Sequence, residues 1–185
     1  PRGDGFISGS RVNRELALLK AVFNRGIEWG LAADNPVRAV KFFSEKDKAR
    51  TRYLPFEEAD RLWEICQPQL RRIVLFALKT GMRQSEILAL RWQDIDPVTN
   101  QITLKKTKSG KIRFIPIHPD VAELLQNLPK TSEWIFPGKD RNHLTWHGAL
   151  RAEWEKALEL AGIRDFRFHD LRHTFASRLV RSGVD

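Results

Sequence analysis

The spacing of apolar residues along this 185-residue chain changes twice, and that change limits the folds it can adopt. Residues 12–31 and 56–90 repeat apolar side chains every three or four positions, which predicts helices. Residues 101–105 and 111–115 alternate polar and apolar side chains, which predicts two half-buried strands joined by a turn. Helical spacing then returns. We therefore expect an α+β fold that is mainly helical, with one small antiparallel sheet.

Glycine and proline residues divide the helical stretches into separate segments. The expected helices cover residues 10–30, 56–66, 69–79, 84–90, 121–128, 145–161 and 168–181. A short strand around residues 91–95 is expected to join the predicted hairpin, which gives a three-stranded sheet. No internal repeat interrupts this order.

A polar, charge-rich stretch without periodicity covers residues 44–52 and is predicted to be a linker. The 43 residues before it are too few to bury a core of their own. We interpret residues 1–43 as the end of a preceding helical domain, and residues 53–185 as a second domain.

The composition favours a protein that binds polyanions. Lysine and arginine number 32 against 23 acidic residues, which gives a net charge of +9. Such an excess is typical of proteins that bind nucleic acid. A single cysteine, Cys66, excludes an internal disulfide, so we expect a reducing, cytoplasmic location. Cys66 lies on an apolar helix stripe, so we expect it to pack in the core. The longest apolar run, residues 73–78, is far shorter than the ~20 residues of a membrane span.

An arginine stands where a glycine turn leads into a helix, in the segment Thr80-Gly81-Met82-Arg83-Gln84-Ser85-Glu86. The first N–H groups of a helix and its positive dipole end favour anions. The positive charge of Arg83 is therefore unfavourable there unless an anion binds beside it or Glu86 offsets it. Glu86 lies three residues later on the same helix face. A surface ion pair without further function is the alternative.

A histidine and a second arginine lie three residues apart in the last helical segment, so they share one face. The core face of that helix is formed by other residues, namely Phe168, Leu171, Phe175 and Leu179. Arg172 offers a bidentate fork to phosphate, and His169 adds a proton that can move near neutral pH. A capping histidine beside a surface arginine is the alternative.

Four lysines cluster at the predicted hairpin tip: Lys105, Lys106, Lys108 and Lys111. Their charge suits contacts with the DNA backbone. A lysine on a mobile tip can also protonate a leaving oxygen, and Lys108 is the candidate for that role. A solvated turn is the alternative.

A metal site is not expected. His169 and His173 have the spacing of a zinc-peptidase helix, but Asp170 stands where that pattern needs glutamate. Arg172 would repel a cation, and one cysteine cannot form a thiolate cluster. We therefore do not expect metal-dependent chemistry.

Three of these motifs together resemble the phage integrase, or tyrosine recombinase, family. Residues 80–92, TGMRQSEILALRW, resemble its first arginine box. Residues 107–117 resemble its catalytic-lysine hairpin, and residues 169–176, HDLRHTFA, resemble its His-x-x-Arg box. Residues 12–37 resemble the end of its helical, SAM-like core-binding domain. The order matches the family, and the resemblance covers nearly the whole chain.

The resemblance implies a site-specific recombinase that acts on double-stranded DNA, with the parent protein assembled as a tetramer. In that family a tyrosine attacks a phosphodiester and forms a 3′-phosphotyrosyl link without metal or cofactor. Arg83 and Arg172 would clamp the non-bridging oxygens, and Glu86 would neutralise part of their charge. Lys108 would protonate the 5′-oxygen leaving group, and His169 would assist proton transfer.

One departure from the family pattern bears on activity. The family places its nucleophilic tyrosine after the His-x-x-Arg helix, whereas the single tyrosine here, Tyr53, precedes both boxes. We therefore expect this chain to be a fragment that binds DNA without cleaving it. A non-catalytic DNA-binding module of the same fold and a metal-free nuclease are the alternatives.

Overall fold

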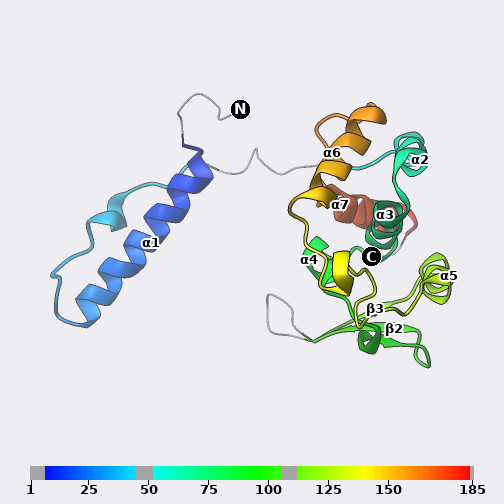
Figure 1. Ribbon diagram of the computed structural model, residues 1–185. Coiled ribbons are helices and arrows are strands. Elements are labelled where there is room, and N and C mark those ends of the chain that lie inside the picture. Colours follow the sequence, from blue (N-terminus) through cyan, green and yellow to red (C-terminus); the bar gives the residue numbers. More distant parts are fainter. Residues whose placement is uncertain (1–6, 45–51, 106–111, 184–185) are drawn as a thin grey trace. The chain divides into compact units, whose positions relative to one another are not determined.

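The computed structural model describes residues 7–44, 52–105 and 112–183 of the chain. The chain divides into two compact units, Pro1–Arg50 and Thr51–Asp185, which are described separately below. Figure 1 shows both units with their helices and strands labelled.

The first unit consists of one long helix and a return segment. Helix α1 (Gly9–Glu28) begins after Ser8, whose hydroxyl accepts the backbone N–H of Arg11. The return segment contains the 3-10 turn η1 (Pro36–Ala39), capped by the Asn35 side chain, which accepts the N–H of Val37 at 3.0 Å. The Asn35 amide also donates to the Lys20 carbonyl of α1 at 3.0 Å and so ties the return segment to the helix.

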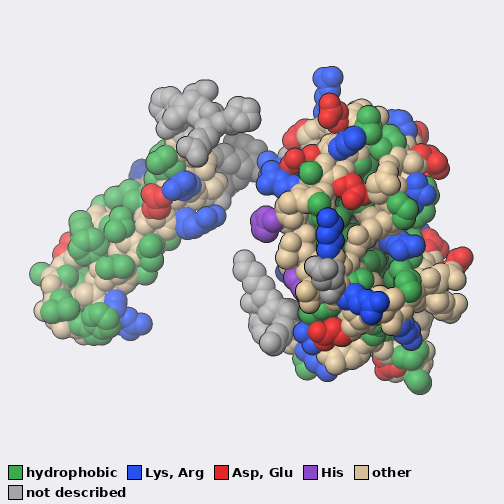
Figure 2. All heavy atoms as spheres, viewed as in Figure 1, with side chains coloured by type: hydrophobic (Ala, Val, Ile, Leu, Met, Phe, Trp, Pro, Cys, Tyr) green, Lys and Arg blue, Asp and Glu red, His purple; other side chains and the backbone are tan. Residues whose placement is uncertain are grey.

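Much of the apolar surface of this unit is exposed. Large apolar side chains face solvent along α1 and just after it, among them Leu18, Val22, Trp29 and Leu31. Figure 2 shows hydrophobic side chains gathered over this unit. The described part of the unit therefore does not enclose a core of the size that the second unit has.

The second unit is mainly helical and is built around α3. Its helices are α2 (Phe56–Ile65), α3 (Pro68–Thr80), α4 (Gln84–Leu88), α5 (Pro119–Asn127), α6 (Ala149–Leu160) and α7 (Asp170–Arg181). Helix α3 begins at Pro68, whose fixed φ suits a first helical position. Its buried side chains include Ile73, Val74, Phe76 and Ala77, and it packs against α4, α5, α6 and α7.

A small antiparallel sheet closes one end of this unit. Its strands, in spatial order, are β1 (Ile95–Asp96), β2 (Gln101–Leu104) and β3 (Arg113–Pro116). Ile102 pairs with Ile115 and both are buried, so the alternation predicted for β2 is confirmed. At β3 the expected faces are reversed, because Ile112 and Phe114 are exposed whereas Ile115 is buried. The Asp96 carboxylate accepts the N–H groups of Val98 and Thr99 and so shapes the turn between β1 and β2. The predicted fold class is confirmed: a mainly helical domain with one three-stranded antiparallel sheet.

Most element boundaries lie within two residues of those predicted, and two elements differ more. The expected strand at residues 91–95 is mostly a 3-10 turn, η3 (Trp92–Asp94), because the Asp94 carboxylate accepts the Arg91 N–H at 3.0 Å and favours a turn. Helix α6 begins four residues later than expected, since Gly148 has φ +78° and cannot continue a helix. Trp146, just before it, packs its ring against Phe168 instead.

No helix in the described part of the chain is long and apolar enough to cross a membrane. Cys66 is buried in the core of the second unit, and burial raises the pKa of its thiol to about 11. A thiol in that state is uncharged at neutral pH, which agrees with a packing role.

Candidate active site

Arg83 is placed by the turn between α3 and α4. Gly81 ends α3 with φ +60°, a left-handed conformation that glycine adopts without strain. The chain then turns through Arg83, which directly precedes the first residue of α4. The Glu86 carboxylate accepts both the Arg83 backbone N–H and its side-chain Nη1, each at 2.8 Å. The predicted pairing of Arg83 with Glu86 is therefore present.

Glu86 also binds a second arginine. Its Oε2 atom accepts Nη2 of Arg113, the first residue of β3, at 2.9 Å. Burial alone would raise the pKa of Glu86, but hydrogen bonds from Arg83 and the charges of Arg113 and Arg83 bring the pKa below its usual value. Glu86 is thus an ionised carboxylate, 9% exposed, that joins two cations.

Sequence reasoning did not single out Arg113, because the alternation of residues 111–115 groups it with Lys111 on the polar face of the strand. In an alternating strand, residues two apart share a face, so Arg113 lies on the same face as Ile115, which is buried. A charged side chain on the core-facing side of a strand needs a partner. That partner is Glu86.

Arg172 reaches the same turn from a distant part of the chain. It lies in the first turn of α7, and its Nη1 donates to the main-chain carbonyl of Gly81. One helical turn later, the ring of Phe175 packs on Gly81 so closely that a Cβ atom at residue 81 would collide with it. Helices α3 and α7 therefore pack against each other through a glycine, and this contact brings Arg172 next to Arg83.

The start of α7 is itself anchored inside the domain. Thr174 is buried, donates its hydroxyl to the Asp170 carbonyl at 2.8 Å and accepts the backbone N–H of Leu54 at 2.9 Å. The Asp170 carboxylate accepts the N–H of Arg167 at 2.7 Å, just before the helix. These bonds fix the segment that carries His169 and Arg172.

His169 directly precedes α7 and lies at the edge of the arginine cluster. Partial burial lowers its pKa, and the positive charges of His173, Arg172 and Arg83 lower it further, while Asp170 opposes them. The rings of His169 and His173 meet edge to face with centroids 5.2 Å apart. At neutral pH His169 is therefore a neutral imidazole that can accept a proton.

The predicted lysines are only partly described. Lys106, Lys108 and Lys111 lie outside the described residues. Lys105 is exposed directly after β2 and, together with Glu86, lines a hollow of about 380 Å³.

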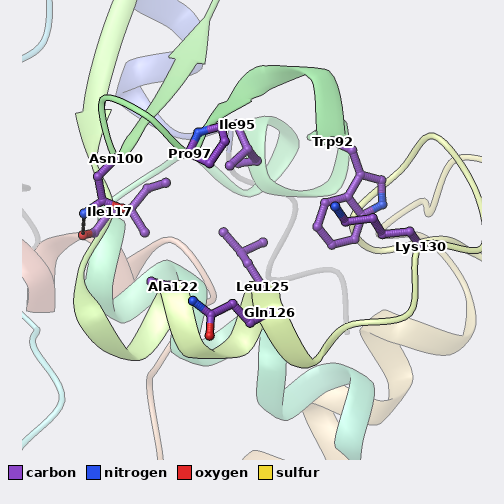
Figure 3. A pocket seen from close by; sticks show the side chains of 9 residues that line it. All are labelled: Trp92, Ile95, Pro97, Asn100, Ile117, Ala122, Leu125, Gln126 and Lys130. Atoms are coloured by element: carbon purple, nitrogen blue, oxygen red, sulfur yellow. Dashed lines mark hydrogen bonds between the residues drawn. The ribbon is translucent and has the colours of Figure 1, made fainter.

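Another hollow of the domain lies apart from these residues. It has a volume of about 400 Å³ and is bounded by η3, the β1–β2 turn and α5. Figure 3 shows Trp92 beside Lys130 at one end of it, and the Asn100 side chain bonded to the Ile117 carbonyl at the other. None of the predicted site residues lines it, and much of its lining is apolar. The arginine cluster is therefore the candidate active site.

The cluster combines three guanidinium groups with one carboxylate and one neutral imidazole. Burial lowers the pKa of Arg172, and the charges of Arg113 and Arg83 lower it further. The excess positive charge fits an anion with several oxygens, such as a phosphodiester. Within the described residues, no group of three His, Cys, Asp or Glu side chains could hold a metal ion.

The sequence profile of the phage integrase family matches residues 52–185. The chain therefore belongs to the phage integrase family.

Several curated proteins are similar to the chain. The integrase of Salmonella phage P22 is 35% identical over 181 residues, which cover 91% of this chain and 45% of that protein. A shufflon-specific DNA recombinase of Escherichia coli is 35% identical over 187 residues, which cover 99% of this chain and 47% of that protein. The chain thus spans about half the length of these relatives.

A solved structure supports the fold. A lambda integrase (75–356) dimer bound to a COC′ core site superposes with a TM-score of 0.79, covering 96% of this chain and 69% of that one. Its sequence identity is 22%, so the likeness concerns the fold.

Proposed function

We propose that this chain is the catalytic part, without the attacking tyrosine, of a site-specific tyrosine recombinase that acts on double-stranded DNA. The observation that carries the proposal is the convergence of Arg83 and Arg172 at Gly81, although 91 residues separate Arg172 from that glycine. Two half-buried positive charges at one turn repel each other, which is costly unless an anion compensates them. A DNA phosphate supplies that anion.

Each residue has a role in this proposal. Arg83 and Arg172 bind the non-bridging oxygens and stabilise the charge that develops on them during phosphoryl transfer. His169, neutral in the free site, accepts or relays a proton. Lys108 protonates the 5′-oxygen leaving group, and the neighbouring lysines contact the DNA backbone. Neither a metal nor a cofactor takes part.

The proposed organisation follows the same resemblance. Residues 1–43 are the end of a core-binding domain, residues 44–52 a linker and residues 53–185 the catalytic domain. The whole protein acts in the cytoplasm of a bacterial cell and assembles as a tetramer on DNA.

Tyr53 does not serve as the nucleophile in this proposal. Its hydroxyl accepts a hydrogen bond from Arg181 at 3.1 Å, and the Arg181 guanidinium lies 4.7 Å from the centre of its ring. Arg181 is the last residue of α7, whereas Arg172 is in the first turn. With a rise of about 1.5 Å per residue, Arg172 and Arg181 are about 14 Å apart along the helix axis.

DNA binding by this chain tests the proposal. With about six phosphate contacts, affinity for a fluorescent duplex should fall about 10³-fold between 50 and 200 mM salt, as measured by anisotropy. Replacing both Arg83 and Arg172 by alanine should weaken binding, whereas Arg151→Gln, which removes one charge from an exposed pair with Glu155, should change it less than about twofold. A salt-independent affinity, or no binding at low salt, would contradict the proposal.

Covalent chemistry provides a second test. After incubation with a suicide duplex that carries the cognate site, a denaturing gel should show no protein–DNA adduct for this chain. An adduct would mean that the attacking group has been misplaced. Cleavage by hydrolysis, without an adduct, would favour a nuclease.

A further inference from the structure

The three hydrogen bonds to the Glu86 carboxylate come from two segments of the chain. Oε1 accepts Nη1 of Arg83, while Oε2 accepts the Arg83 backbone N–H and Nη2 of Arg113. Both oxygens therefore accept hydrogen bonds, and Oε2 accepts one from the sheet and one from the turn before α4.

The two arginines are supported differently. Arg113 belongs to β3, where its backbone pairs with Leu104 of the neighbouring strand. Arg83 precedes a helix of only five residues, and its own backbone N–H is held by Glu86.

Arg113 also restricts how Arg83 can bind Glu86. Arginine and carboxylate readily form a bidentate pair in which two guanidinium nitrogens face two oxygens. Here Arg113 donates a hydrogen bond to Oε2, and the side chain of Arg83 donates to Oε1 through Nη1. The Arg83 side chain is 39% exposed, so the rest of its fork is accessible to a ligand.

The charge of Arg113 belongs to the same cluster. Its effect on the pKa of Arg172 is second only to burial and exceeds that of Arg83. Arg113, Arg83 and Arg172 thus share one electrostatic environment with a single carboxylate, Glu86, among them.

We propose that Arg113 is a positioning residue for Arg83: its ion pair with Glu86 fixes the carboxylate and prevents Arg83 from closing into a bidentate pair that would turn it away from the phosphate. This inference rests on the proposed function, in which Arg83 binds a DNA phosphate. Without Arg113, the Glu86 carboxylate can rotate and take both terminal nitrogens of Arg83.

A double-mutant cycle tests this proposal on the whole chain. Duplex binding is measured by anisotropy at fixed salt for Arg113→Gln, Arg83→Gln and the combined variant. Each single variant should weaken binding about three- to tenfold, the scale of one charge-assisted contact. The combined variant should bind no more weakly than Arg83→Gln, because Arg113 acts through Arg83.

Conservative and matched variants separate positioning from other roles. Arg113→Lys keeps a donor for Glu86 and should restore binding to within about twofold of the wild type. Arg151→Gln removes an equal charge from an exposed pair on α6 and should have less than about a twofold effect. Urea unfolding of each variant verifies that the domain is folded.

The outcomes are distinct. If Arg113→Gln weakens binding equally with and without Arg83, Arg113 contacts DNA independently and the inference is wrong, while the proposed function stands. If Arg113→Lys binds as weakly as Arg113→Gln although both are folded, the inference is again wrong. If Arg83→Gln itself has no effect, the proposed phosphate clamp fails, and this inference fails with it.

Discussion

Arg83 and Arg172 meet at one turn but are supported in two different ways. Arg83 is held by a carboxylate three residues away, so its partner is local and carries a compensating charge. Arg172 is held by the main-chain carbonyl of Gly81, 91 residues away, which is neutral. The Glu86 carboxylate neutralises part of the positive charge, whereas the Gly81 carbonyl orients Arg172 without adding a negative charge.

This difference separates two tasks that a phosphate site must perform. The Glu86 bridge lets Arg83 and Arg113 lie close together without a large repulsion. Arg172 has no carboxylate bonded to it within the described residues, and its charge then provides the attraction for an anion. Breaking either support should therefore have distinguishable consequences, and the four predictions below run from the largest expected effect to the smallest.

Removing either arginine should affect chemistry more than binding. In a longer chain that carries these residues and an attacking tyrosine, Arg172→Ala and Arg83→Ala should each raise the barrier to strand cleavage by about 3–4 kcal/mol. Single-turnover cleavage of a suicide duplex measures this barrier. DNA affinity should fall less than about tenfold in parallel. Cleavage at a normal rate by either variant would remove that arginine from the clamp.

Substituting Gly81 should disrupt the support of Arg172 and spare that of Arg83. Gly81→Ala combines a left-handed backbone with a collision against Phe175, so the free energy of unfolding should fall by about 2–4 kcal/mol. Urea denaturation measures the loss. Gly162→Ala is the matched control, because Gly162 has φ +68° but open space around it, and about 1 kcal/mol is expected there. Equal losses at the two glycines would show that the Phe175 contact is unimportant.

Loosening the start of α7 should have a smaller effect. Thr174→Val keeps the shape of the side chain but leaves the buried N–H of Leu54 without its acceptor, at a cost of about 1–3 kcal/mol. Thr174→Ser retains the hydroxyl and should lose less. Chemical denaturation of both variants gives the comparison, and a valine variant as stable as the serine variant would contradict the assigned bond.

The smallest expected effect is the pH dependence through His169. The pKa of this histidine is lowered in the free folded chain, so its stability contribution is complete above about pH 6.5 and is lost as pH falls below that value. A bound phosphate opposes the neighbouring positive charges and raises the pKa, so binding takes up a proton. DNA affinity should therefore rise as the pH falls below about 6.5, by less than about tenfold.

Two substitutions distinguish His169 from the other histidines. His169→Asn should remove part of the pH dependence, whereas His118→Asn, at the start of α5, should not. Binding measured by anisotropy between pH 8 and pH 5.5 provides the readout. An affinity that rises with pH would reverse the assigned sign.

The local half of the site could be predicted from the sequence, and the distant half could not be derived from spacing. Arg83 and Glu86 are three residues apart at a helix start, so geometry alone brings them together. No periodicity links Arg172 to the turn at Gly81. The convergence of Arg172 with Arg83 was expected only from the resemblance to a family, and the bond to the Gly81 carbonyl was not expected. The left-handed turn at Gly81 and the ring of Phe175 decide that contact in three dimensions.

Arg113 shows a different limit of sequence reasoning. The alternation of residues 111–115 correctly indicated a strand, which the structure places at Arg113–Pro116. It assigned Ile112 and Phe114 to the core face, but both are exposed, and the buried face instead carries Ile115 and the half-buried Arg113. Its partner depends on how the sheet packs beside α4, and the alternation itself carries no such information. The late start of α6 is decided by the left-handed backbone at Gly148, and Trp146 before it packs against Phe168, neither of which the helical spacing shows.

The carbonyl that receives Arg172 has a consequence for mutational studies. Every amino acid has a main-chain carbonyl, so no codon change at position 81 can delete this acceptor. A mutational scan that looks for lost side-chain functional groups will therefore miss the Gly81 carbonyl, which is one of the two supports of the arginine pair. The loss caused by substitutions at position 81 will instead increase with the size of the new side chain. The hydrogen-bond acceptor of Arg172 will therefore appear in such data as a steric constraint on a residue that has no side-chain functional group.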